Sequence, residues 1–233
     1  METVEPQTPS PLLRVRNLTK AYRNEDVETR ALAGVSLEVA AGEFLAVTGP
    51  SGCGKSSLLN VLGLLDPADG GSYRLLGEEV LGLSDAALAR LRRQHVGFVF
   101  QGFNLMDDLT VEENVEVAVI HRGMGAARGR IREVLGAVGM SHRAGHRPRQ
   151  LSGGQQQRVA IARALAGSPS LILADEPTGN LDSANGEAVI GLLRDVADAG
   201  TAVVMVTHSA VHAAAADRVV AMLDGEIIDE ARP

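Results

Sequence analysis

The chain lacks several features that small proteins use to stabilise a fold. Its 233 residues include one cysteine, no tryptophan and only 3% aromatic residues. A single cysteine excludes an internal disulfide and is typical of a reducing compartment. Because aromatic residues are scarce, Leu, Val, Ile and Ala must fill the core. An apolar content of 45% is enough for one domain, or for one domain with an inserted subdomain.

Long apolar runs are also absent, since none reaches the ~18 residues that a membrane-spanning helix needs. The first residues, METVEPQTPSP, are acidic and proline-rich, unlike a secretory signal peptide. We therefore expect residues 1–11 to form a disordered tail and residues 12–233 to form the folded domain.

Lysine is nearly absent too, because Lys20 and Lys55 are the only lysines among 22 basic residues. The net charge is −7, yet residues 86–167 carry twelve arginines against six acidic residues. A basic segment in an acidic chain favours contact with an anionic partner such as a membrane surface. A solvated helical face is the alternative interpretation.

Apolar strand patterns alternate with helical ones along the chain. Strand patterns cover 12–22, 35–49, 70–80, 96–100, 171–175, 201–208 and two short pieces of 218–228. Helical patterns cover 56–65, 84–93, 101–139 with glycine breaks, 155–165, 186–200 and 209–218. This order predicts a mainly parallel sheet with helices on both faces.

Residues 49–56, GPSGCGKS, fit the phosphate-loop pattern G-x-x-x-x-G-K-[ST] between a strand and a helix. The glycines let backbone amides curl around phosphates, Lys55 reaches the terminal phosphate oxygens, and the Ser56 hydroxyl can ligate Mg²⁺. A compact ammonium suits this contact, even in a chain that otherwise prefers arginine. Cys53 is either a thiol whose modification blocks nucleotide binding or a small residue at a permissive position.

A second pattern for binding anions begins at residues 151–155, LSGGQ, which open a helical segment. A serine and two glycines at a helix start offer a hydroxyl, bare N–H groups and the positive end of the helix dipole to anionic oxygen. Two such elements that serve one nucleotide in one small domain require an unusual geometry.

Three further polar residues follow apolar strands. Asp175 and Glu176 end LILADE, where neighbouring side chains point in different directions. Asp175 can hold Mg²⁺ while Glu176 faces an attacking water as general base, or the pair forms a surface turn before Pro177. His208 follows the strand AVVMVT, at the sheet edge where ligands bind in such folds. It could hydrogen-bond a terminal phosphate, or be structural.

Two more residues are weaker candidates. Gln101 follows the strand VGFVF, and its side-chain oxygen could touch Mg²⁺ or the attacking water, or it is a plain loop residue. Tyr22 lies in the first strand pattern and could stack on adenine, or simply end the strand.

Together these segments resemble the nucleotide-binding subunit of ABC transporters, over about residues 12–230. The resemblance implies an α/β fold: a RecA-like P-loop NTPase core, an N-terminal antiparallel β-subdomain and an inserted α-helical subdomain at about 102–163. It identifies 49–56 as Walker A, LILADE as Walker B, LSGGQ as the family signature and His208 as the switch histidine.

By the same resemblance, the residues that bind nucleotide are Tyr22, Gly49, Pro50, Ser51, Gly52, Cys53, Gly54, Lys55, Ser56, Ser57, Gln101, Ser152, Gly153, Gly154, Gln155 and Asp182, the last in the D-loop. The implied metal ligands are Ser56, Gln101 and Asp175, and the implied catalytic residues are Glu176, His208 and Lys55.

The resemblance also implies a head-to-tail dimer around two Mg·ATP, each held between Walker A of one copy and the signature of the other. The chain is expected to hydrolyse ATP at the cytoplasmic face of the cell membrane, bound to a separate multi-span permease subunit and to no nucleic acid. The helical subdomain and the Gln101 loop should receive the cytoplasmic helices of that permease.

The segments FVFQGFNLMDDLTVEENV and PTGNLDS are similar to the macrolide-exporter and lipoprotein-releasing subgroup. Antimicrobial-peptide exporters and a cell-division ATPase that signals through a membrane partner are alternatives from the same branch. Ser209 stands where the subgroup usually has an acidic residue. A DNA-repair ATPase would need a long coiled coil between the two motifs, and a translation-type ATPase usually carries two such domains in one chain.

Overall fold

The computed structural model describes residues 11–24, 27–121 and 128–232. Its strands are β1 (Leu13–Asn24), β2 (Val27–Val39), β3 (Phe44–Thr48), β4 (Gly70–Leu75), β5 (Glu78–Glu79), β6 (Val96–Phe100), β7 (Leu171–Asp175), β8 (Ala202–Val206), β9 (Arg218–Leu223) and β10 (Glu226–Ala231). Its α-helices are α1 (Lys55–Leu62), α2 (Asp85–His95), α3 (Val111–His121), α4 (Arg128–Ala137), α5 (Gly153–Ala166), α6 (Ser183–Asp198) and α7 (Ala210–Ala213). Two short 3-10 helices cover Ser141–Arg143 and Pro148–Gln150.

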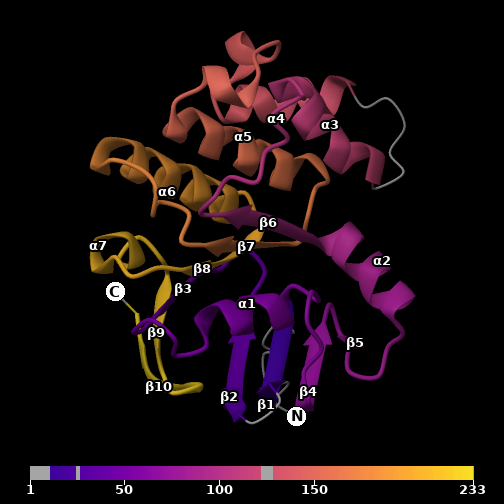
Figure 1. The fold of residues 1–233 in the computed structure, drawn as a ribbon, viewed down its shortest axis with the longest axis vertical. Helices are drawn as coiled ribbons and strands as arrows, with labels where there is room; N and C mark the ends of the chain where they lie inside the picture. The colour runs from indigo at the N-terminus through magenta and orange to yellow at the C-terminus, as the bar shows by residue number, and fades with distance from the viewer. Residues whose placement is uncertain (1–10, 25–26, 122–127, 233) are drawn as a thin grey trace, which may run out of the picture.

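A six-stranded sheet of order β10-β9-β3-β8-β7-β6 forms the centre of the molecule (Figure 1). All its neighbouring strands run parallel except β9 and β10. The inner strands β7 and β8 are apolar runs because α1 packs on one face and α5 and α6 lie over the other. The parallel strands β3, β6, β7 and β8 therefore bring the residues that follow them to one edge.

A four-stranded antiparallel sheet of order β2-β1-β4-β5 lies on the far side of α1. Helix α1 is held between the two sheets, since its Leu58, Leu59 and Leu62 belong to one buried cluster with residues of both. The buried Tyr73 of β4 donates a hydrogen bond to the carbonyl of Leu62, with 2.6 Å between the oxygens. This second sheet supports the helix that follows the phosphate loop.

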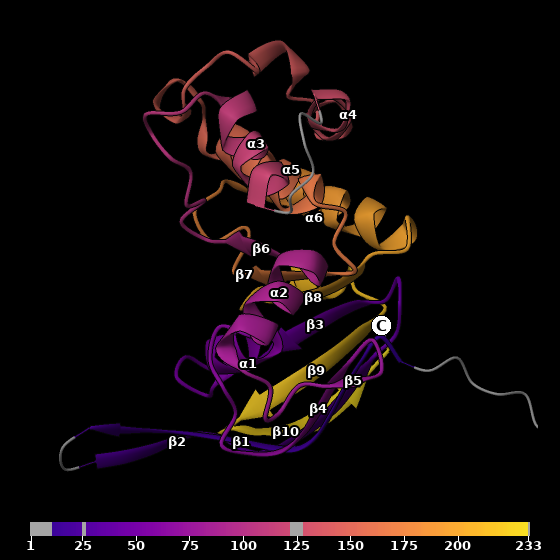
Figure 2. The same ribbon diagram turned by 90° about the vertical axis from the view of Figure 1, so that its right-hand side faces the viewer.

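The helices α3 and α4 form a layer above the core sheet, and α5 connects that layer to the sheet (Figure 2). The apolar residues Val111, Val115 and Val119 of α3 recur every four positions and are buried. They join the core cluster that includes Val159 of α5.

The helical pattern predicted from residue 101 is wrong over its first ten residues, because helix α3 begins only at Val111. Phe103 and Asn104 have positive φ angles of 58° and 52°, which a helix excludes. Thr110 marks the helix start, because its hydroxyl oxygen accepts from the Glu113 N–H while the Glu113 carboxylate accepts from the Thr110 N–H.

Other predicted segments differ in extent. The helical pattern at 209–218 yields only the four residues of α7 before β9 begins. Strand β2 starts at Val27, well before the predicted 35, and pairs with β1 along a long hairpin. The predicted tail lies outside the described residues apart from Pro11. Among the helices that the structure describes, none has the length and apolar character to cross a membrane.

Candidate nucleotide-binding site

The phosphate loop connects the end of β3 to the start of α1 and needs glycine at two positions. Gly49 has φ +148°, and a Cβ there would lie 2.3 Å from the carbonyl oxygen of Met222. Gly54 has φ +101°, and a Cβ there would lie 2.2 Å from the carbonyl oxygen of Ala31. The predicted loop therefore depends on close backbone approach as well as on conformational freedom.

Lys55 is almost fully buried, at 6% exposure, in the first turn of α1. Its ammonium donates to the carbonyls of Gly49 and Pro50, at 2.8 and 2.7 Å, and so closes the loop on itself. Gly54 occupies the N-cap of α1 and has no side chain that could cap the helix. The N–H groups of the first turn are therefore suited to an anion. Cys53 is buried in the same loop, with its Sγ 3.8 Å from the Lys55 nitrogen.

Ser56 and Asp175 come together across the sheet edge, as predicted for metal ligands. Their Oγ and Oδ1 atoms lie 3.4 Å apart. The described residues hold no cluster of three or more His, Cys, Asp or Glu suited to a metal ion. One carboxylate and one hydroxyl fit Mg²⁺, which is commonly held by one or two protein oxygens together with phosphate oxygens of a substrate.

Glu176 and His208 meet where β7 and β8 end. The His208 ring atom Nε2 lies 3.0 Å from one Glu176 carboxylate oxygen, and the backbone N–H of His208 donates to the other oxygen at 3.3 Å. Glu176 has a positive φ of 45°, an uncommon backbone conformation that turns the chain directly after the strand. The pair is a carboxylate held in place beside an imidazole, which suits a general base and a phosphate contact.

The structure places the Gln101 side chain on the segment after Walker B. Its Nε2 donates to the Asn180 side-chain oxygen at 3.1 Å, and the Asn180 amide donates back to the Gln101 carbonyl at 3.0 Å. Gly179 allows this contact, since a Cβ there would lie 2.6 Å from Gln101 Nε2. Gln101 therefore pairs with Asn180 here rather than with Ser56 or Asp175.

Tyr22 is 40% exposed beside α1 and is fixed by its hydroxyl, which donates to Asp66 at 2.6 Å. Burial first, and then this hydrogen bond, raise the pKa of Tyr22, while a hydrogen bond with Ser57 acts to lower it. The buried Lys20 pairs with Asp66 at 2.8 Å, and its ammonium lies 5.2 Å from the centre of the Tyr22 ring. No local sequence pattern predicts this support, although the rarity of lysine is a signal for Lys20.

The signature residues start α5 by capping it themselves. The Ser152 hydroxyl accepts from the Gln155 N–H at 3.3 Å, while the Gln155 side chain accepts from the Ser152 N–H at 3.1 Å. This capping box leaves the N–H groups of Gly153 and Gly154 for a ligand, and it gives Gln155 a structural task. Gly154 lies against α6, where a Cβ would be 2.3 Å from the side-chain oxygen of Asn185.

Asp182 caps α6 with its carboxylate alone, accepting from the Asn185 N–H at 2.9 Å and from its side-chain amide at 2.7 Å. The backbone hydrogen bond, and then the side-chain one, lower the pKa of Asp182. The D-loop and the signature therefore pack on each other at the starts of α6 and α5. The phosphate loop leads into α1 on the opposite face of the core sheet (Figure 1).

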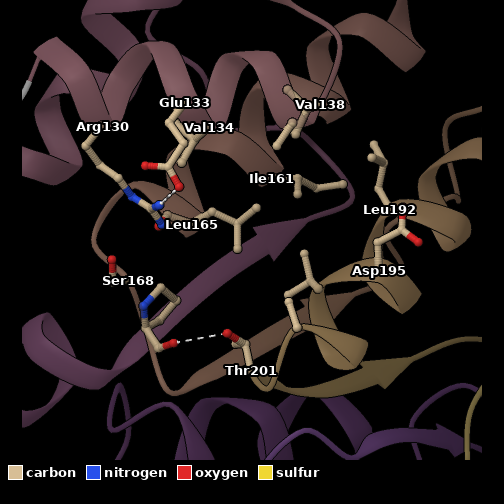
Figure 3. Close-up of a pocket in the computed structure, with 14 residues that line it drawn as sticks. Arg130, Glu133, Val134, Val138, Ile161, Leu165, Ser168, Leu192, Asp195 and Thr201 are labelled. Atoms are coloured by element: carbon tan, nitrogen blue, oxygen red, sulfur yellow. Dashed lines mark hydrogen bonds and ion pairs between the residues drawn. The ribbon is translucent and has the colours of Figure 1, made fainter.

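A cavity of about 350 Å³ lies elsewhere, between α4, α5 and the C-terminal half of α6 (Figure 3). Apolar side chains such as Val138, Ile161 and Leu192 line it, with Arg130 and Glu133 paired at one side. None of the predicted site residues lines this cavity.

Comparison with known proteins shows the family of the chain. The family model described as "ABC transporter" matches residues 32–179. The chain belongs to the ABC transporter family. It is therefore an ATPase of the ATP-binding cassette type, and the predicted family, α/β fold and enzyme class are confirmed.

Relatives and solved structures give the same result. The chain is 46% identical over 226 residues to the macrolide export ATP-binding/permease protein MacB of Azoarcus sp., and 47% identical over 221 residues to MacB of Escherichia coli K12. These matches cover 96% and 94% of this chain but 34% of each relative, so the chain spans about a third of their length. The ATP-binding cassette MJ0796, solved as a dimer in a post-hydrolysis state bound to ADP and Pi, superposes with a TM-score of 0.87 at 42% identity. That match covers 94% of this chain and 98% of MJ0796.

Proposed function

We propose that the chain hydrolyses Mg·ATP as a head-to-tail dimer and that hydrolysis powers a membrane permease. The proposed dimer is supported chiefly by the positions of two helix N-termini that are suited to anions. The start of α1 and the start of α5 belong to helices on opposite faces of one sheet. A second copy of the chain brings its signature to the phosphate loop of the first, and the MJ0796 cassette was solved as a dimer.

In this site the loop 49–56 and Ser57 hold the phosphates and Tyr22 stacks on the base. Ser56, Asp175 and Gln101 are the proposed protein oxygens for Mg²⁺, which neutralises phosphate charge when bound. For Gln101 this requires exchange of its bond with Asn180.

Turnover is then carried by Glu176, which takes a proton from the attacking water. His208 and Lys55 stabilise the charge on the transferred phosphoryl group. The γ-phosphate is contacted by the partner's copies of Ser152, Gly153 and Gly154. Hydrolysis removes this phosphate from between the two chains and so loosens the dimer. Asp182 and Gln155 support the site at the starts of their helices.

The permease is proposed from the relatives, which carry ATP-binding and permease functions under one name. The chain aligns with a third of their length, and we propose that it acts at the cytoplasmic face of the membrane with a multi-span partner. Export, as in the macrolide exporters, is the favoured role. A cell-division type of ATPase that signals through its membrane partner is the alternative, and copurification of the partner distinguishes the two.

Two inactive variants test the composite site, that is, a site made of the phosphate loop of one copy and the signature of the other. Lys55→Ala removes the phosphate contact of one copy, and Ser152→Asp places a carboxylate at the signature while keeping a good helix cap. Each variant alone should lack turnover. A 1:1 mixture should recover roughly a quarter of wild-type activity, since half of random dimers are mixed and each has one intact site. Ser152→Asn, a neutral cap, is the matched control. A mixture as inactive as its components would refute the composite site.

A further inference from the structure

A fully buried glutamine on α5 has no role in the site described so far. Gln157 is 0% exposed, and its Nε2 donates to the carbonyl of Pro177 at 2.7 Å and to that of Phe100 at 3.3 Å. Its Oε1 is buried and has no hydrogen-bond partner within the described part of the chain. Burying a polar group that is only partly satisfied is costly, so core stability alone does not account for a glutamine here.

The two carbonyls belong to the segments that carry the catalytic machinery. Phe100 ends β6 and immediately precedes Gln101, while Pro177 immediately follows Glu176. In the parallel pairing of β6 with β7, Phe100 stands opposite Asp175. One amide group therefore bridges the ends of two neighbouring strands, next to the general base.

The same helix begins with the signature. Gln157 lies five residues after Ser152, about one and a half turns into α5. Further along, Arg163 donates to the carbonyls of Phe103 and Asn104, in the loop that follows Gln101. Helix α5 thus contacts the chain on both sides of Gln101, at Phe100 and at Phe103–Asn104. Because α5 is one continuous helix, a shift of its first turn would also move Gln157.

We propose that Gln157 is a positioning residue that links the signature of a chain to the Glu176 of the same chain. This inference rests on the head-to-tail dimer proposed above. In that dimer the signature contacts the ATP held by the partner, whereas Glu176 acts on the ATP held by its own chain. Gln157 therefore couples occupancy of one site to the geometry of the base in the other.

Mixed dimers with one working site test the link. A large excess of Glu176→Gln chain is mixed with a chain that keeps Glu176, so that hydrolysis comes from the minor chain alone. Gln157→Met removes both donors at similar size and is placed in either chain. In the chain with the working Glu176 it should lower single-turnover hydrolysis roughly tenfold more than in the excess chain, since two buried hydrogen bonds are lost. ATP affinity of the isolated chain should change by less than about twofold.

A purely structural glutamine gives a different pattern. If Gln157 only supports the signature, the larger loss follows the substitution in the excess chain, or is equal in both, and either result overturns the proposal. Gln156→Met is the matched control, because the neighbouring Gln156 donates to the carbonyl of Leu151, in the signature, and not to the strand ends. Any effect of Gln156→Met should be larger in the excess chain, whose signature faces the working site.

Two further measurements keep the outcome clear. Thermal unfolding shows whether Gln157→Met is folded, and if it is not, Gln157→Asn, which keeps the amide but is too short to bridge both carbonyls, replaces it with the same expected asymmetry. Ser152→Asp in the excess chain must abolish hydrolysis. If it does not, the dimer proposal has failed, whereas loss with Ser152→Asp and no asymmetry at Gln157 refutes the coupling alone.

Discussion

Gly154→Ala should destabilise the folded chain, although helix propensity predicts the opposite. Alanine in place of glycine in a helix contributes about 0.5–1 kcal/mol on propensity grounds. In this structure, however, the new Cβ would lie 2.3, 2.5 and 2.9 Å from the Oδ1, Cγ and Cβ atoms of Asn185. Asn185 cannot move freely, because its side-chain amide donates to Asp182 at 2.7 Å.

The cost follows from overpacking, which in well-packed regions is about 1–3 kcal/mol. For a chain of this length that corresponds to a fall in melting temperature of roughly 2–12 °C. Thermal unfolding followed by circular dichroism measures it. Gly191→Ala in α6 is the matched control, because its Cβ would meet nothing within 4 Å, and it should raise the melting temperature slightly.

A double-mutant cycle locates the cause. Asn185→Ala removes the two nearest contact atoms, so Gly154→Ala should cost at least about 1 kcal/mol less in that background. ATP binding to the single chain should survive Gly154→Ala while ATP-dependent dimerisation falls. A Gly154→Ala protein that melts at or above the wild-type temperature would refute the packing analysis.

Four further outcomes are expected. Glu176→Gln should keep ATP affinity, lower turnover roughly 10²-fold or more and let an ATP-bound dimer accumulate on size-exclusion chromatography; normal turnover would remove Glu176 from the role of base. Tyr22→Ala should lose about 1–3 kcal/mol of ATP binding in a fluorescence titration, whereas Tyr22→Phe, which loses only the bond to Asp66, should lose less; equal losses would exclude stacking. The pKa of Asp182 is lowered in the folded state, so its stabilisation is present above the unfolded pKa and disappears as the pH falls through the folded value; Asp182→Asn should therefore show a shallower acid loss of stability in melts between pH 7 and 3, and parallel profiles would contradict this. N-ethylmaleimide should modify the buried Cys53 slowly and abolish ATPase activity, with ATP protecting; unprotected or harmless modification would leave Cys53 a space-filling residue.

The sequence predicted the position of the candidate site residues that end or follow apolar strands. Asp175 ends a parallel strand, loop 49–56, Glu176 and His208 follow parallel strands, and parallel strands end at one edge regardless of details elsewhere. The pairing of Ser56 with Asp175 and of Glu176 with His208 is a consequence of that topology.

Contacts that depend on long-range packing were not predictable from local patterns. The bond of Gln101 to Asn180 and the bridge made by Gln157 join segments far apart in the chain. The helix start at Val111 was missed because the positive φ angles of Phe103 and Asn104 have no clear local signature in non-glycine residues.

The two lysines allow local opening around the nucleotide site to be measured by proteolysis. Lys20 and Lys55 are both buried, at 7% and 6% exposure, and their ammonium groups are bound to Asp66 and to loop carbonyls. A lysine-specific protease therefore has no exposed target in the folded chain, and cleavage requires local opening around the site. The rate of cleavage with and without ATP would measure the free energy of that opening, while an arginine-specific protease would report on the surface of the same molecule.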